Sequence, residues 1–403
     1  MSLRICMIND EQFPHKAADT INVVRTASSL GEAGARVELL VPWMYKDGLP
    51  RDELCAYYGV PPTFELVRLP SPAPITRILR PEKLTHALLA PWVALTRGCD
   101  LIYSRNLAPL FFAQLMGKPW VFETYRRFAE ETPWLSRLSR HLPLGNALAA
   151  VTHSELSAQS LRELGFSRES IFTVYSGYLP QEVSPRLEKK EARELCGFDT
   201  QRPIVLHLGN IDPYIRIDLL LKMAMRIPEI TFLFVGGYEK QQAYWKKVVQ
   251  DMSLDNVIFV ANRPPAEVRQ YVYAADVLAV VPRNADLVTQ GSGFSLSLYK
   301  VLPGLPMKIM LYAATGIPIF APDLPYLGEI LQDGGNAVLY PVDSADQAAT
   351  RLRGLIEDGA LAGRVSGTAL HDKRFNTWSE RGKRILDFLQ GRMSGRQTGV
   401  TDS

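Results

Sequence analysis

Residues 203–237 read PIVLHLGNIDPYIRIDLLLKMAMRIPEITFLFVGG, and this stretch decides the fold. It contains an apolar run that ends at Gly209, a helix-like stretch that begins near Asp218, and a second apolar run that ends at Gly236 and Gly237. The order strand, helix, strand predicts a parallel sheet, because parallel neighbours need a long crossover connection. Four more apolar runs follow, separated by helix-like segments: NVIFVA, VLAVVP, IPIFAP and AVLYP. The second half of the chain is therefore predicted to be a doubly wound α/β domain.

The first half of the chain shows the same alternation. The run RICMIN at residues 4–9 precedes a helical pattern over residues 22–33, and the run RVELLVP follows it. This β-α-β order predicts another parallel sheet. Further strand candidates are FELVRL, DLIYS, PWVFE, ALAAVTH and IFTVYSG.

Changes in composition set the predicted domain limits. The first domain is predicted over residues 1–180 and the second over residues 200–374. Residues 181–199 contain Pro185 and the charged run RLEKKEARE, which is typical of a linker. Residues 394–403 are polar, contain two glycines, and are predicted to be a flexible tail.

The composition excludes several classes of protein. Hydrophobic residues make up 47% and charged residues 22% of the 403, which is typical of a globular protein with two cores. The net charge of +3 is too small for nucleic-acid binding as a main function. The four cysteines lack CxxC spacing, so we expect neither a metal site nor redox chemistry. No apolar run approaches the roughly 20 residues that cross a bilayer, and the start MSLRICMIND reads as a strand, so the sequence predicts a cytoplasmic protein.

The residues after the first strand of the second domain are candidates for anion binding. Ligands of doubly wound sheets bind beyond the carboxyl ends of the strands. Here Gly209 and Asn210 follow the strand, and Arg216 precedes a helix whose N-terminus offers N–H groups to a phosphate. Arg216 could add a bidentate contact. An ordinary strand–helix turn with a solvated arginine is the alternative.

Two other strand ends of this domain suggest the same kind of ligand. Gly236 ends its strand without a Cβ, which allows a nucleotide or another backbone to approach. Lys308 precedes a predicted helix over residues 309–315, where the helix dipole disfavours a cation unless an anion is also present. A diphosphate would supply that anion. A lysine that extends into solvent is the alternative.

Six segments, taken in order, resemble glycosyltransferase family 4, the retaining glycosyl transferases group 1. They are DLIYSRN (100–106), GKPWVFETY (117–125), VYSGY (174–178), HLGNIDPYIRIDLLL (207–221), MKIMLYAATGIPIFAPDLPYLGEIL (307–331) and FNTWSERGKRILDFL (375–389). The resemblance implies the GT-B fold: two facing Rossmann-like domains with a cleft between them. It also implies that a closing helix at about residues 375–392 returns to the first domain.

The resemblance further implies a nucleotide-sugar donor in the second domain and an acceptor in the first. Arg216 and Lys308 are the candidates for stabilising the donor diphosphate, and Tyr125 is a candidate catalytic residue whose alternative is a packed aromatic. Donor-binding candidates are Gly209, Asn210, Gly236, Asn262, Arg263, Leu311 and Tyr312. Acceptor-side candidates are Ala17, Ala18, Glu123 and Arg126. No metal and no other cofactor is expected.

The sequence departs from the family at several of these positions. Leu311 and Pro303 stand where family members usually carry two glutamates, the second of which contacts the donor ribose. Tyr125 replaces a usual histidine, Asn210 replaces an arginine, and Ala17-Ala18 replaces a glycine pair. The chain is therefore identified as a divergent member. Its expected activity is sugar transfer, with retention, from a nucleotide-diphosphate sugar to a saccharide or glycolipid, in the synthesis of cell-surface polysaccharides or glycoconjugates.

A non-catalytic role remains as the alternative function. A GT-B-fold protein without turnover would bind a sugar nucleotide or a partner transferase.

Residues 75–144 suggest contact with a membrane. This region carries ten Lys or Arg against five Asp or Glu, and PWLSRLSRHLPL mixes Trp134 and leucines with Arg137 and Arg140. Such a face suits peripheral contact with an anionic membrane, at its inner face, where lipid-linked acceptors reside. An ordinary solvated helix is the alternative.

Overall fold

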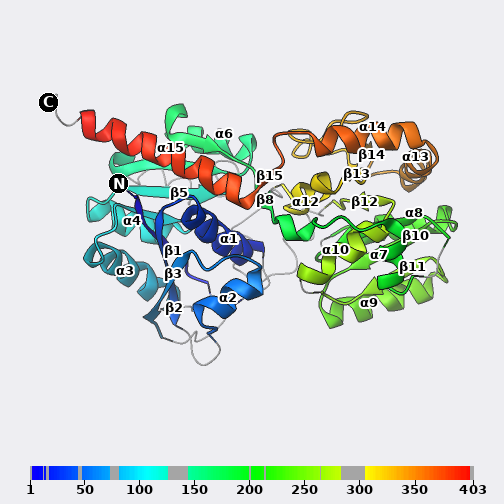
Figure 1. The fold of residues 1–403 in the computed structure, drawn as a ribbon, viewed down its shortest axis with the longest axis horizontal. Helices are drawn as coiled ribbons and strands as arrows, with labels where there is room; N and C mark the ends of the chain where they lie inside the picture. Colours follow the sequence, from blue (N-terminus) through cyan, green and yellow to red (C-terminus); the bar gives the residue numbers. More distant parts are fainter. Residues whose placement is uncertain are drawn as a thin grey trace. The chain divides into compact units, whose positions relative to one another are not determined.

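The chain forms two compact units in a computed structural model. Unit 1 comprises Met1–Gly177 together with Asn376–Ser403, and unit 2 comprises Tyr178–Phe375 (Figure 1). The structure describes residues 2–11, 13–14, 18–43, 48–72, 81–125, 144–198, 201–212, 215–263, 265–282 and 305–399.

Unit 1 is built on a parallel sheet of seven strands in the order β3-β2-β1-β4-β5-β6-β7. The strands are β1 (Arg4–Ile8), β2 (Arg36–Trp43), β3 (Phe64–Pro70), β4 (Leu101–Ser104), β5 (Trp120–Thr124), β6 (Ala147–Thr152) and β7 (Ile171–Thr173). The helices are α1 (Ala18–Glu32), α2 (Arg51–Tyr58), α3 (Pro81–Thr96), α4 (Leu107–Leu115), α6 (Glu155–Glu163) and α15 (Trp378–Gly399). The predicted doubly wound first domain is confirmed.

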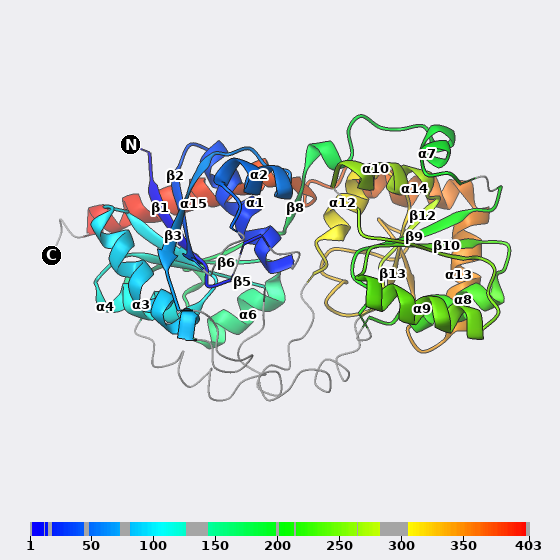
Figure 2. The same ribbon diagram turned by 90° about the horizontal axis from the view of Figure 1, so that it is seen from below.

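Helices cover both faces of this sheet (Figure 2). On one face, apolar residues of α3, α4 and α6 share a core with alternate residues of the central strands, including Ile8 and Phe122. On the other face, α1 packs against α15. A Cβ on Gly382 of α15 would lie 2.4 Å from the carbonyl oxygen of Ser29 in α1. The C-terminal helix therefore needs glycine at this position in order to lie so close to α1.

Unit 2 is built on a parallel sheet of six strands in the order β11-β10-β9-β12-β13-β14. The strands are β9 (Ile204–Leu208), β10 (Thr231–Val235), β11 (Val257–Val260), β12 (Val277–Ala279), β13 (Ile319–Pro322) and β14 (Val338–Tyr340). The helices are α7 (Lys189–Leu195), α8 (Ile217–Arg226), α9 (Glu239–Asp251), α10 (Pro265–Ala274), α12 (Lys308–Thr315), α13 (Ala345–Glu357) and α14 (Gly359–Leu370). Each of the six predicted apolar runs contains one of these strands.

The predicted linker and tail contain regular structure. Helix α7 lies inside residues 181–199, packs against α10 and belongs to unit 2. Helix α15 continues to Gly399, inside the segment that was predicted to be a flexible tail. The remaining elements near the unit limits are β8 (Gly177–Tyr178) and β15 (Asn376–Thr377), which pair in a two-stranded sheet.

The strand order of each sheet reverses at one place. In unit 1 the chain runs outward from β1 to β3 and then restarts at β4, on the other side of β1. In unit 2 the same reversal lies between β9 and β12. At such a point the loops that follow the two strands diverge and leave a crevice, which is where doubly wound proteins bind their ligands. The topology therefore singles out the loops after β1, β4, β9 and β12.

A buried ion pair attaches α15 to the sheet of unit 1. Arg381 and Glu123 are both fully buried, and Arg381 Nη2 donates to Glu123 Oε1 at 2.7 Å. His153 Nε2 lies 2.5 Å from the same oxygen, and Arg381 Nη1 donates to Thr26 Oγ1 at 3.0 Å. Burial alone would raise the pKa of Glu123, but Arg381 and His153 hold that pKa well below its usual value. The carboxylate is therefore charged and compensated inside the protein.

Replacing Arg381 should destabilise unit 1 strongly. The change Arg381→Met leaves the Glu123 carboxylate buried without its cation, which costs about 3–5 kcal/mol of unfolding free energy. Urea denaturation measures this loss. Arg384→Met is the matched control, because Arg384 lies on the same helix but is exposed. A loss below about 1 kcal/mol for Arg381→Met would contradict a stabilising role for the ion pair.

Candidate functional site

Two glycines shape the loops after β9 and β10 in unit 2, next to the reversal point between β9 and β12. Gly209 follows β9 with φ of +116°, and Gly236 follows the neighbouring strand β10 with φ of +129°. A Cβ on Gly236 would lie 2.3 Å from the carbonyl oxygen of Gly209. Both the positive φ and the close approach require glycine here. The structure thus brings together two predicted donor-binding residues that lie on separate strands.

Lys308 lies against the same loop. It is the first residue of α12, and its Nζ lies 3.3 Å from the point where a Cβ of Gly209 would stand. The same Nζ is 3.5 Å from Nε2 of His207, a buried residue of β9. The glycine loop and the ammonium group therefore meet at the carboxyl edge of the sheet, as a phosphate site requires.

Asn210 takes part in a side-chain network that holds the loop. Its amide donates to Asp212, and the Asp212 backbone N–H donates back to Asn210 Oδ1 at 3.1 Å. Gln241 of α9 donates to the second carboxylate oxygen of Asp212. The amide of Asn210 thus stabilises the turn after β9.

Arg216 immediately precedes α8. Its guanidinium forms an ion pair with Asp218 at 2.9 Å, and its backbone N–H donates to the carbonyl of Pro282, after β12, at 3.0 Å. The residue therefore bridges the loops on the two sides of the reversal point. Its charge is engaged by Asp218, so an anion that bound here would have to compete with that carboxylate.

The other donor-binding candidates differ in their environments. Tyr312 is fully buried, and its hydroxyl accepts a hydrogen bond of 3.0 Å from the backbone N–H of Leu208, which ties α12 to the end of β9. Leu311, next to it, is 7% exposed. Asn262 and Arg263 are exposed after the edge strand β11, and Arg263 pairs with Glu267 at 3.5 Å. Tyr312 thus has a clear structural role, and a ligand contact for the other three stays a prediction.

The acceptor-side candidates in unit 1 are only partly described. Ala17 and Arg126 lie outside the described residues, and of Ala18 only its position at the start of α1 is known. Glu123 forms the buried ion pair with Arg381, so the structure already gives its carboxylate a partner. Tyr125 follows β5, with the Arg105 guanidinium carbon 5.0 Å from its ring centroid. Acceptor contacts for these residues stay predictions.

Unit 1 has a second polar cluster, which the sequence reasoning missed. Asp10 follows β1 and accepts a 2.9 Å hydrogen bond from Asn106, which follows β4. Lys83 of α3 lies 3.4 Å from Asp10 and 2.6 Å from Glu11. Asn9 is 1% exposed, and its Nδ2 has no hydrogen-bond partner in the part of the chain that the structure describes. These groups meet at the reversal point of unit 1, and the rule applied above to the second domain would have found them.

Burial raises the pKa of Asp10, and the ammonium of Lys83 opposes this effect. The carboxylate can accept hydrogen bonds from the hydroxyls of a polyol, and the amide and ammonium groups beside it can donate to them. The cluster is therefore suited to a sugar-like ligand.

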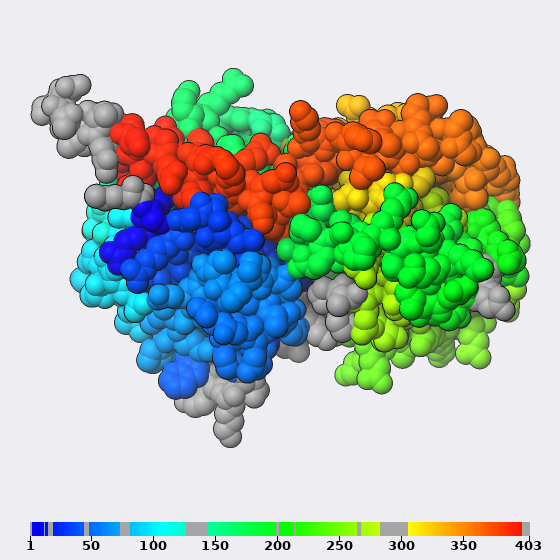
Figure 3. Space-filling model, in the orientation of Figure 1, coloured from blue at the N-terminus to red at the C-terminus, as the bar shows by residue number. Residues whose placement is uncertain are grey.

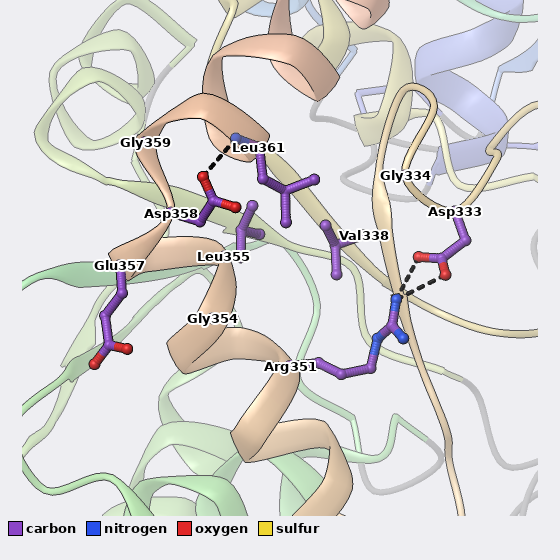
Figure 4. A pocket seen from close by; sticks show the side chains of 10 residues that line it. All are labelled: Asp333, Gly334, Val338, Arg351, Gly354, Leu355, Glu357, Asp358, Gly359 and Leu361. Carbon is purple, nitrogen blue, oxygen red and sulfur yellow. Dashed lines mark hydrogen bonds and ion pairs between the residues drawn. The ribbon is translucent and has the colours of Figure 1, made fainter.

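A cavity of about 740 Å³ lies elsewhere in unit 2 (Figure 4). It is next to Val338, the first residue of β14, and so at the amino edge of the sheet, away from the glycine loop. Its arginine, Arg351, is paired with both oxygens of Asp333 at 2.5 and 2.7 Å, and Asp358 caps α14. Because these charges already have partners in the protein, we do not assign this cavity to the candidate site.

The described residues contain neither a membrane-spanning helix nor a cluster of metal ligands. No described helix is long and apolar enough to cross a membrane. Likewise, no three His, Cys, Asp or Glu side chains of that part of the chain gather as a metal site would need.

The sequence is similar to known sugar transferases. Residues 202–358 match the family described as Glycosyl transferases group 1. Over 202 residues the chain is 25% identical to a GDP-mannose-dependent alpha-(1-6)-phosphatidylinositol monomannoside mannosyltransferase of Mycolicibacterium smegmatis, covering 49% of this chain and 50% of that protein. A phosphatidyl-myo-inositol mannosyltransferase of the same organism is 26% identical over 195 residues, covering 47% and 45%. The chain thus spans about half the length of the curated relatives it matches.

Solved structures match over nearly the whole chain. HepE of Anabaena, in complex with UDP, has a TM-score of 0.72 at 17% identity, covering 96% of this chain and 100% of that chain. Sucrose-phosphate synthase from Thermosynechococcus elongatus has a TM-score of 0.76, also at 17% identity, covering 98% and 100%. At this identity the likeness establishes the fold alone. The chain therefore has the GT-B fold, and its residues 202–358 match the glycosyl transferases group 1 family.

Proposed function

We propose that this chain is a retaining glycosyltransferase that moves a sugar from a nucleotide-diphosphate sugar to a saccharide or glycolipid acceptor. The observation that carries the proposal is the meeting of Gly209, Gly236 and Lys308 beyond the carboxyl ends of β9 and β10, next to the reversal point of unit 2. Backbone without a Cβ beside an ammonium group suits a diphosphate. HepE, which shares the fold, is solved with UDP and with UDP-glucose.

The proposed chemistry depends on stabilising a leaving group. The bond between the sugar and the diphosphate breaks, a bond to an acceptor hydroxyl forms, and the hydroxyl proton passes to the released diphosphate or to water. Negative charge grows on the diphosphate as its bond breaks, and Lys308 would stabilise that charge. Arg216 would add to this effect if a phosphate replaced Asp218 as its partner.

The polar cluster of unit 1 supports a hydroxyl-rich acceptor. Asp10 and Asn106 offer a carboxylate and an amide at the reversal point of that sheet. The curated relatives are named for acceptors that contain inositol, which is itself a polyol. We therefore propose a saccharide or the head group of a glycolipid as the acceptor.

Exposed apolar residues support a lipid-linked acceptor. Leu84, Leu88 and Trp92 are spaced four residues apart on α3, and Phe111 and Leu115 are spaced in the same way on α4. All five are exposed, Leu84 by 62% and Trp92 by 56%. The two helices pack against each other, and their surface is light blue and cyan in Figure 3.

The chain has no charged residue over residues 84–96 or 107–117. Residues spaced four apart share one face of a helix, so this surface suits the interface of a bilayer. We propose peripheral contact with the cytoplasmic face of a membrane, in the synthesis of cell-surface polysaccharides or glycoconjugates.

One observation favours the second candidate function, a non-catalytic protein that binds a sugar nucleotide or a partner transferase. Leu311 lies where family members usually place the glutamate that contacts the donor ribose, and its side chain is apolar and buried. Such a protein would release no nucleotide when an acceptor is added. Acceptor-dependent nucleotide release therefore separates the two candidates.

Nucleotide binding tests the donor site. In a thermal-shift assay with a panel of nucleoside diphosphates and nucleotide sugars, a ligand at about 100 times its Kd should stabilise the protein by roughly 2.7 kcal/mol. Lys308→Ala and Arg216→Ala should each reduce the shift at the same nucleotide concentration and lower turnover on the order of 100-fold. Lys247→Ala, on the exposed face of α9, is the control. A wild-type protein that no nucleotide stabilises would rule out the transferase.

Substitutions in unit 1 test the acceptor site. Asp10→Asn and Asn106→Ala should each lower acceptor-dependent turnover by about 10-fold or more, because each removes hydrogen bonds to buried hydroxyls. The Kd for the nucleotide should not change, because unit 2 holds the proposed donor site. Steady-state kinetics and calorimetry give the two quantities. Asp52→Asn, an exposed residue of α2, serves as the control, and equal turnover in all variants would contradict the assignment.

Vesicle binding tests the membrane contact. Leu84→Glu should weaken sedimentation with phosphatidylcholine–phosphatidylglycerol vesicles about 10-fold or more, since it removes apolar area and adds repulsion. Leu195→Glu is matched to it, because Leu195 is a 57% exposed leucine of α7. Absence of wild-type binding at low salt, or equal loss in both variants, would refute this surface.

A further inference from the structure

His207 is the polar residue of the buried strand β9, whose other residues are Ile204, Val205, Leu206 and Leu208. Its side chain is 1% exposed, and burying a polar ring among apolar residues costs free energy unless hydrogen bonds compensate. Three groups surround the ring nitrogens. Nδ1 lies 3.4 Å from the carbonyl oxygen of Ala279, and Nε2 lies 3.2 Å from the carbonyl oxygen of Asn210 and 3.5 Å from Lys308 Nζ.

The surroundings favour a neutral ring. Burial and the neighbouring charge of Lys308 lower the pKa of His207 well below its usual value. A neutral imidazole has one N–H and one nitrogen lone pair. If the hydrogen were on Nε2, it would donate to the carbonyl of Asn210 at 3.2 Å, but it would also face the N–H groups of Lys308, and the Nδ1 lone pair would face the oxygen of Ala279.

The opposite tautomer avoids both repulsions. With the hydrogen on Nδ1, the ring donates to Ala279, and Nε2 accepts a hydrogen bond from Lys308. In this tautomer the Nε2 lone pair lies 3.2 Å from the carbonyl oxygen of Asn210, which is one unfavourable contact against two in the other tautomer.

Lys308 needs such a contact for two reasons. It begins α12, where the helix dipole opposes a positive charge. Its side chain is also long and has many rotamers. The ammonium group therefore needs a contact that holds it where the ligand binds.

We propose that His207 is a positioning residue for Lys308: through Nε2 its imidazole accepts a hydrogen bond from the ammonium group and fixes it beside Gly209. This inference rests on the proposed function, because Gly209 and Lys308 belong to the proposed donor site. It adds a residue that does not touch the donor itself. The imidazole fixes the position of the Lys308 ammonium group before the diphosphate binds.

Two amide variants separate the roles of the two ring nitrogens. In His207→Asn the amide takes the place of Nδ1, so it keeps a donor for Ala279 but cannot reach Lys308. In His207→Gln the amide oxygen reaches the place of Nε2 and can still accept from Lys308. Both variants keep a polar amide in the same buried position, and their melting temperatures report whether each one folds.

The first measurement reports the reactivity of the Lys308 amine directly and needs no nucleotide. Peptide mass spectrometry gives the rate at which acetic anhydride acetylates Lys308. His207→Asn should raise this rate several-fold because the amine loses the hydrogen bond to Nε2, while His207→Gln should leave it near the wild-type value. The exposed Lys247 provides an internal reference in the same digest. An unchanged Lys308 rate in a folded His207→Asn protein overturns the inference.

The second measurement uses UDP and GDP as probes in calorimetry. His207→Asn should raise Kd about 10-fold, the size expected for losing a hydrogen bond to a charged group, and His207→Gln by no more than about 3-fold. The double variant His207→Asn/Lys308→Ala should bind no more weakly than Lys308→Ala alone, because the histidine acts through the lysine. Losses that multiply in the double variant overturn the positioning role. If neither nucleotide binds the wild type, the proposed function fails, and the acetylation rates still decide the inference.

Discussion

The contact between Gly236 and the carbonyl of Gly209 is the constraint on which the donor side of this protein depends. Because no Cβ fits between them, the loops after β9 and β10 can approach each other at the carboxyl edge of the sheet. Tyr312 then holds α12 to the end of β9, which brings Lys308 to the same place. A side chain at Gly236 would push the two loops apart, whereas a Cβ at Gly209, where φ is +116°, would meet the Lys308 ammonium group at 3.3 Å.

The two units compensate their buried polar side chains in different ways: unit 1 uses an ion pair, and unit 2 uses a neutral imidazole. In unit 1, Glu123 and Arg381 neutralise each other inside the protein, and their contact joins parts of the chain that are 258 residues apart. In unit 2, no described acidic side chain contacts the buried ring of His207, and its neighbour is the ammonium group of Lys308. The first arrangement is suited to stability, whereas the second fits the anion site that we propose beside Gly209.

The fold was predictable from the sequence because its signal is local. Each strand of unit 2 is a short apolar run such as residues 204–208, and the alternation with helices indicates a parallel sheet without further information. The candidate site residues were predictable where they end an apolar run, as Gly209 does, or precede a predicted helix, as Lys308 does. Asp10 and Asn106 also follow apolar runs, so the same rule would have made each a candidate. Their contact, however, joins residues 96 apart and depends on strand order, which periodicity does not reveal. In the same way, Glu123 ends an apolar run and was therefore predicted to contact the acceptor. In the structure it pairs with Arg381, which lies far away in the sequence on α15.

The apolar side chain of Leu311 is expected to lower the affinity for the donor more than the rate of the chemical step. A ribose hydroxyl that loses one acceptor costs roughly 1–3 kcal/mol, which is about a 5- to 150-fold change in binding. That contact is the same before and during the reaction, so its loss weakens donor binding without removing the charge stabilisation that lowers the barrier. Lys308 acts on charge that grows only as the bond breaks. A site that lacks the glutamate but keeps the lysine beside Gly209 is therefore consistent with a transferase that binds its donor weakly, and the substitution at position 311 does not by itself argue for an inactive protein.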